Sequence, residues 1–123
     1  MPNVTGWKLD PGQRAELLRQ FPPLYPNVDA DHVTLASDVP PDAPLPAPAD
    51  AEIVGRADDR AGVEAMVVRL DGATARPDGS TYHITWSLGE GREARESNAV
   101  IARCGWAEFD LPMPVLLHPA RWP

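Results

Sequence analysis

The sequence has 123 residues, a formal net charge of −7 and a hydrophobic fraction of 43%, which suits a globular chain better than a disordered one. No apolar run approaches the roughly 20 residues that a membrane-spanning helix needs. Lys8 is the single lysine, and the other ten cations are arginines. Extended, sequence-independent binding along a nucleic-acid duplex is therefore disfavoured, because it depends on many basic groups. A small anionic ligand, or one RNA end met by a few arginines, remains compatible with this charge.

Two further features bear on location. Residues 1–10 lack the basic start and apolar core of a signal peptide. The single cysteine, Cys104, cannot form an internal disulfide and is expected to be a small buried hydrophobe. We therefore expect a monomeric cytoplasmic protein with one domain over residues 1–123.

The first expected element is a helix over residues 10–21, which Asp10 caps and in which Pro11 suits the first turn. A short strand, "HVTLA" (residues 32–36), comes next. The five prolines of "SDVPPDAPLPAPAD" (residues 37–50) then predict a surface loop in extended conformation. A role for this loop as a lid or partner-docking segment is left open.

The second half of the chain is richer in strand signals. Strands are expected over residues 51–57 and 62–71, joined by a hairpin turn, and over residues 81–88. A helix should begin with Ser97 as its N-cap and end at Gly105. The prolines in the last segment restrict it to a sheet edge. This order of elements predicts an α+β fold with mainly antiparallel pairing.

Two of the three histidines share one local pattern. "HVTL" contains His32 and Thr34, and "HITW" contains His83 and Thr85, whereas His118 has no threonine at the matching place. Side chains two residues apart in a strand point to the same face. Each motif therefore has a polar face with one imidazole and one hydroxyl, and an apolar face that anchors it.

These residue types suit phosphoryl chemistry. Displacement at phosphorus needs a base for the attacking water and an acid for the leaving oxygen, and histidine serves either role near neutral pH. Threonine hydroxyls donate hydrogen bonds to phosphate oxygens, where charge accumulates in the transition state. We therefore predict His32 and His83 as catalytic residues and Thr34 and Thr85 as phosphate-binding residues.

Several other side chains are weaker candidates. Ser87 follows Thr85 by two residues and could add a hydroxyl, while Arg92 could meet a phosphate. Tyr25, like Trp7 and Trp106, is a candidate for stacking on a base. Strand alternation turns Trp86 away from the polar face, so it is expected in the core.

The paired motifs resemble the H-x-T/S-x repeats of the 2H phosphoesterase superfamily. Within it, the chain is most similar to the cyclic phosphodiesterase domain of fungal- and plant-type tRNA ligases, where "HVTLA"-type and "HITW/V"-type motifs are followed by a Ser-Asn pair before a helix. The matching pair here is Ser97 and Asn98 in "REARESNAVI".

The resemblance implies two pseudo-symmetric lobes of mainly antiparallel strands with flanking helices around a central cleft. It implies opening of a 2′,3′-cyclic phosphate on an RNA end or a cyclic nucleotide, without metal or other cofactor, to leave a 2′-phosphate. His32 and His83 would share the acid and base roles, in either order.

Two alternatives stay open. The same site could act on 2′-5′ linkages or on ADP-ribose cyclic phosphate. The chain could also be a module that binds nucleotide phosphates without turnover, although such a module needs no acid–base pair. A metal site is disfavoured because neither histidine has a third ligand near it in sequence.

Overall fold

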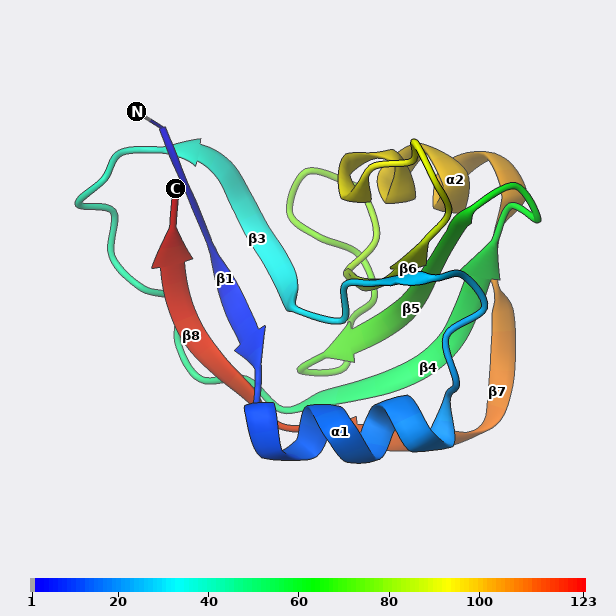
Figure 1. Cartoon of the computed structure of the whole chain (residues 1–123). Helices are drawn as coiled ribbons and strands as arrows, with labels where there is room; N and C mark the ends of the chain where they lie inside the picture. Colours follow the sequence, from blue (N-terminus) through cyan, green and yellow to red (C-terminus); the bar gives the residue numbers. More distant parts are fainter. Residues whose placement is uncertain (1) are drawn as a thin grey trace.

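The computed structural model describes residues 2–123, which contain eight β-strands, two α-helices and one short 3-10 helix (Figure 1). In chain order these are β1 (Asn3–Leu9), α1 (Pro11–Gln20), β2 (Asn27–Val28), β3 (His32–Val39), β4 (Ala51–Asp58), β5 (Val63–Leu70), β6 (His83–Leu88), η1 (Ala94–Glu96), α2 (Ser97–Cys104), β7 (Ala107–Val115) and β8 (Leu117–Trp122). The predicted α+β class is confirmed.

The strands form two sheets. A three-stranded sheet has the order β3-β1-β8, and a five-stranded sheet has the order β2-β6-β5-β4-β7. Neighbouring strands are antiparallel in every pair of both sheets as far as residues 2–123 describe them. In Figure 1 the three-stranded sheet lies at the left and the five-stranded sheet at the right. Helix α1 runs along the bottom of the view, below both sheets. Because the first and last strands meet in one sheet, His32 is held by residues from both ends of the described chain.

A continuous apolar core joins the two sheets and α1. Trp7, Val33 and Leu17 bring the three-stranded sheet and α1 into contact with Ile84 and Trp86 of the five-stranded sheet. A second, smaller cluster lies between α2 and the opposite face of the five-stranded sheet. The core position expected for Trp86 is confirmed, since its side chain has no exposed surface. Its indole Nε1–H donates to the carbonyl of Phe21 over 2.8 Å.

Most of the expected elements are present. Helix α1 begins after Asp10, whose side chain accepts a hydrogen bond from the backbone N–H of Gln13. The β4–β5 hairpin and the close of α2 at Gly105, with φ of 71°, also match the sequence signals. Strand β7 lies at the edge of its sheet, as its prolines require. The loop after β3 is irregular from residue 40 onward, and the carbonyl of Ala47 accepts the indole N–H of Trp7.

Two local predictions are wrong. Ser97 is not the N-cap of α2, because η1 precedes the helix directly and Glu96 occupies the cap position without a side-chain cap. The Ser97 hydroxyl is engaged elsewhere, as described below. Cys104 is exposed rather than buried, since the buried side of α2 consists of Ser97, Val100 and Ile101. No helix within residues 2–123 is both long enough and apolar enough to cross a membrane.

Strand β1 was not expected from the sequence, yet it is the central strand of the sheet that carries His32. The glycine of β1, Gly6, is explained by the close packing of β1 against β3. A Cβ added at Gly6 would lie 2.1 Å from the carbonyl oxygen of Val33 and 3.1 Å from the Cα of Thr34. Gly6 therefore permits the close approach of β1 to β3.

Replacing Gly6 with Ala is expected to lower the free energy of unfolding by about 1–3 kcal/mol, because the added methyl group must push β3 away from β1. Chemical denaturation measures this loss. Gly12→Ala is the matched control, since its added Cβ would meet the side chain of Asp10 at 3.3 Å and, among the described residues beyond its chain neighbours and its own helix backbone, no other heavy atom within 4 Å. Equal stabilities of the two variants would contradict the packing role of Gly6.

Candidate active site

Both histidine motifs face one pocket of about 430 Å³. Its walls include His32 and Thr34 from β3, and His83 and Thr85 from β6. Its other polar side chains come from β3, from the loop between β5 and β6, from η1 and from the start of α2: Ser37, Arg76, Asp78, Arg95 and Asn98. The four predicted residues therefore lie together although they come from two different sheets.

Strand pairing aims the side chains of β3. His32 lies opposite Lys8 and Thr34 lies opposite Gly6, while Val33 lies opposite Trp7. Residues opposite one another in an antiparallel pair share a face, so alternation places Val33 in the core and its two neighbours toward the pocket. Val33 has no exposed surface, in agreement with this assignment.

Strand β6 follows the same logic. His83 lies opposite Val67, Ile84 opposite Met66, and Thr85 opposite Ala65. Ile84 belongs to the core between the sheets, whereas His83 and Thr85 point toward the face that α2 covers.

Two backbone hydrogen bonds fix the approach of the two motifs. The N–H of Asp29 donates to the carbonyl of Trp86, and the N–H of Ala30 donates to the carbonyl of Thr85, each over 2.9 Å. Ala30 has a φ of 48°, so the chain turns sharply just before β3 begins. The start of β3 is thereby tied to the middle of β6.

His83 is arranged to accept a proton at Nε2. Its Nδ1 lies 2.9 Å from the carbonyl oxygen of Thr81, and a carbonyl can only accept, so Nδ1 carries the hydrogen. Neutral His83 then has its lone pair on Nε2. Burial lowers the pKa of His83 below its ordinary value. The positive charges of Arg76 and His32 add to this, and the hydrogen bond to Thr81 partly offsets it.

His32 has a different environment, with a carboxylate at its Nδ1. Asp31 Oδ2 lies 2.9 Å from His32 Nδ1 and 2.6 Å from Lys8 Nζ. Desolvation raises the pKa of Asp31, but hydrogen bonds from Lys8 and His32 outweigh it and hold that pKa below its ordinary value. Asp31 is therefore ionised at neutral pH.

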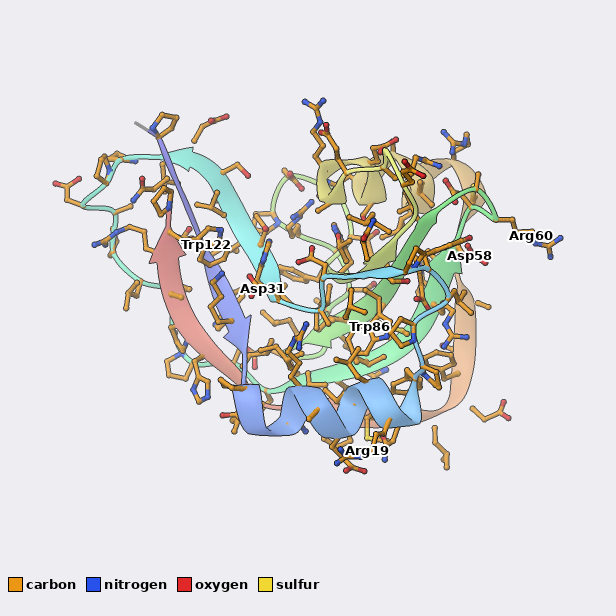
Figure 2. The ribbon with its side chains drawn as sticks, in the orientation of Figure 1. Arg19, Asp31, Asp58, Arg60, Trp86 and Trp122 are labelled. Carbon is orange, nitrogen blue, oxygen red and sulfur yellow. The ribbon has the colours of Figure 1, made fainter. Side chains whose placement is uncertain are left out.

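The ring of His32 also packs against an aromatic side chain. The ring centroids of His32 and Trp122 lie 4.7 Å apart, and Lys8 Nζ lies 4.4 Å from the centroid of the Trp122 ring. Figure 2 shows Trp122 on the three-stranded sheet, with Asp31 at the start of β3. These contacts fix the plane of the imidazole.

The two threonines differ in their surroundings. Thr85 Oγ1 lies 2.8 Å from the hydroxyl of Ser97 and 3.3 Å from the carbonyl oxygen of Ala94. Ser97 is fully buried at the start of α2, so this hydrogen bond explains why it does not cap the helix. Thr34 is half-buried, and its hydroxyl has no hydrogen bond to the rest of residues 2–123. Asn98, which follows Ser97 in the sequence, lies in the pocket wall.

Ser87 does not reach the pocket. Glu64 pairs with Ser87 and Ala65 pairs with Thr85, so β6 contains an extra residue between these pairs. Such a bulge breaks the two-residue alternation. Ser87 is turned to the core face, where it donates to Glu64 Oε1 over 2.6 Å.

The other secondary candidates also lie outside this pocket. Tyr25 donates its hydroxyl to Asp58 over 2.5 Å, and desolvation together with this carboxylate raises the pKa of the phenol. Arg92 pairs with Asp59 and Glu96. The indole of Trp7 is buried in the core, while Trp106 lines a second pocket at the C-terminal end of α2.

Arg76 is part of the site although no sequence signal distinguished it. It lies in the loop between β5 and β6, yet it is 6% exposed. Its guanidinium donates to the hydroxyl of Ser80 over 2.7 Å, to the carbonyl of Thr34 over 3.2 Å and to Asn98 Oδ1 over 2.6 Å. One side chain thus connects the loop, β3 and α2 around the pocket.

The described part of the chain, residues 2–123, contains no cluster of three or more His, Cys, Asp or Glu side chains arranged to hold a metal ion. No family model matches the chain, and searches of curated proteins and of solved structures find no match either.

Proposed function

We propose that this protein is a 2H phosphoesterase-like enzyme that opens a 2′,3′-cyclic phosphate on an RNA end or a small nucleotide, without a metal ion. The observation that carries the proposal is the convergence of two His-x-Thr pairs, from two different sheets, on one pocket. A pocket of about 430 Å³ is within the size range of small-molecule sites.

The different surroundings of the two histidines support separate roles. His83 has Nδ1–H bonded to a carbonyl and a lowered pKa, so its Nε2 lone pair suits the general base. His32 has the ionised carboxylate of Asp31 at Nδ1, which holds the hydrogen there and orients the ring. With His83 as the base, His32 takes the role of the general acid.

His83 takes a proton from water as the water oxygen bonds to phosphorus, and the bond from phosphorus to one ribose oxygen breaks. His32 gives its Nε2 proton to that leaving oxygen. Thr34 and Thr85 donate to the non-bridging oxygens. By the resemblance, O3′ leaves and the product is a 2′-phosphate.

The finer architecture belongs to the same proposal. We take the three-stranded sheet with His32 and the five-stranded sheet with His83 as the two lobes of a pseudo-symmetric fold, and the pocket as the cleft between them. The Asp29–Trp86 and Ala30–Thr85 backbone hydrogen bonds would then be the junction of the lobes.

The direct test is turnover of the four 2′,3′-cyclic nucleoside monophosphates in the presence of EDTA, with the product isomer identified by chromatography against 2′- and 3′-monophosphate standards. We expect metal-independent turnover to the 2′-phosphate. Tight binding without product would favour the binding module. Turnover confined to 2′-5′ linkages or ADP-ribose cyclic phosphate would favour the alternative substrates.

The pH profile of kcat/KM should fall on the acidic side with a midpoint below about 6.5, the ordinary value for histidine. The lowered pKa of His83 keeps its ring neutral, and able to accept a proton, to a lower pH than an exposed imidazole. Steady-state rates from pH 4.5 to 8 measure the midpoint. His118→Ala should leave it unchanged, and a wild-type midpoint above 7 would contradict the base role of His83.

A further inference from the structure

The positive charge of Arg76 is poorly compensated within the protein. Its side chain is 5% exposed, and its three hydrogen-bond acceptors are neutral: Ser80 Oγ, the Thr34 carbonyl and Asn98 Oδ1. Among residues 2–123, Asp78 is the one carboxylate within 4.0 Å of the guanidinium, at 3.7 Å, and it is 68% exposed. Asp78 is itself bonded to the backbone N–H of Ser80 over 2.9 Å.

Arg92 provides a comparison, because carboxylates compensate its positive charge. Arg92 is 24% exposed and contacts two carboxylates, Asp59 at 2.9 Å and Glu96 at 3.1 Å. Arg76 is more deeply buried and has less negative charge around it. Removing a charge from water costs free energy unless an opposite charge accompanies it. An anion in the pocket would supply that charge.

The guanidinium is also held still and has donors to spare. A guanidinium has five N–H groups, and three of those of Arg76 are used by contacts to three different walls of the pocket. One N–H on each terminal nitrogen remains. Arg76 lines the same pocket as both histidines and both threonines.

We infer that Arg76 is the fixed cation of this pocket and binds the ligand's phosphate directly through its remaining N–H groups. In the reaction it is a catalytic residue that neutralises charge on a non-bridging oxygen, the electrostatic task that a bound metal performs in other phosphoesterases. This role in turnover rests on the proposed function, whereas phosphate binding by Arg76 does not. Asp78, whose exposed carboxylate lies 3.7 Å from the Arg76 guanidinium, partly neutralises the positive charge of Arg76 and so competes with the phosphate.

The test is calorimetric titration of the whole protein with adenosine 2′-monophosphate and, separately, with inorganic phosphate, in EDTA. We expect Arg76→Met to weaken binding of both by 10-fold or more, and Asp78→Asn to strengthen it. Arg95→Met is the matched control, because Arg95 lines the same pocket but is 83% exposed and paired with Glu93, and it should change the affinity less than 3-fold. Equal losses for Arg76→Met and Arg95→Met would overturn the inference.

A second variant decides the matter if Arg76→Met does not fold. Asn98→Asp keeps the shape of the side chain but puts a carboxylate beside the Arg76 guanidinium. In the natural protein the Asn98 Oδ1 atom lies 2.6 Å from a terminal nitrogen of Arg76. Ser37→Asp adds the same charge elsewhere on the pocket wall. Asn98→Asp should weaken phosphate binding at least 10-fold more than Ser37→Asp, and equal effects would refute a specific role for Arg76.

The outcomes also separate this inference from the proposed function. Phosphate binding that depends on Arg76, without turnover of any cyclic phosphate, would leave the inference standing and remove the enzymatic proposal. If the natural protein turns over a cyclic phosphate but the Arg76→Met variant binds phosphate equally tightly, the enzymatic proposal stands and the inference about Arg76 is refuted.

Discussion

Replacement of either His32 or His83 with Ala is expected to lower kcat/KM on 2′,3′-cyclic nucleotides by about 10²–10⁴-fold, because each variant removes one proton transfer from the rate-limiting displacement. The two single losses and the double loss should be similar in size, since residues that act as one unit are not additive. Initial rates in EDTA, with the product separated by chromatography, measure the effect.

The third histidine provides the control for this experiment. His118 is exposed, and its Nε2 lies 2.8 Å from Asp10 Oδ1, outside the pocket that holds the other two. His118→Ala should retain nearly full activity. Full activity in either His32→Ala or His83→Ala would refute acid–base catalysis by this pair.

Replacement of Glu64 with Ala is expected to lower the free energy of unfolding by about 3–5 kcal/mol, the cost of breaking a buried charged contact. Glu64 is fully buried, and its Oε1 accepts from the backbone N–H of Leu24 over 3.0 Å and from the hydroxyl of Ser87. Its Oε2 lies 3.1 Å from Nε of Arg56, without good hydrogen-bond alignment. Truncation leaves these donors in the core without an acceptor. Urea denaturation gives the change in free energy.

The same pair of strands contains the control. Glu52 on β4 pairs with Arg69 on β5 at 2.7 Å, but these side chains are 38% and 37% exposed. Glu52→Ala should cost less than about 1 kcal/mol, as half-exposed ion pairs do. If Glu52→Ala and Glu64→Ala lose equal stability, burial is not what makes Glu64 important.

The sequence predicted those parts of the fold that depend on local signals. Asp10 and Pro11 mark the start of α1, Gly105 ends α2, and the turn between β4 and β5 has the expected hairpin form. Strand β1 escaped prediction because its pattern includes Gly6, which is unfavourable in an isolated strand. Its reason lies in the close contact with β3, a tertiary constraint that single-sequence patterns do not contain.

The site shows the same division. Two-residue alternation correctly placed His32 with Thr34 and His83 with Thr85, because β3 and β6 are regular over those residues. It failed for Ser87, since a bulge opposite Glu64 has no signature in this strand. Arg76 could not be found from sequence, as a buried arginine in a Pro- and Gly-containing loop looks like any exposed one.

The antiparallel pairing of β1 with β8 has a consequence for the order of events during synthesis. The five-stranded sheet has its β4–β5–β6 segment within residues 51–88, so the wall that presents His83 can begin to form while the ribosome is still adding later residues. The sheet that presents His32 is completed only by residues 117–122, which add its third strand and the Trp122 ring against His32. The complete pocket should therefore form late, after most of the chain has emerged, and a nascent chain stalled before residue 117 should fold in part without completing the pocket.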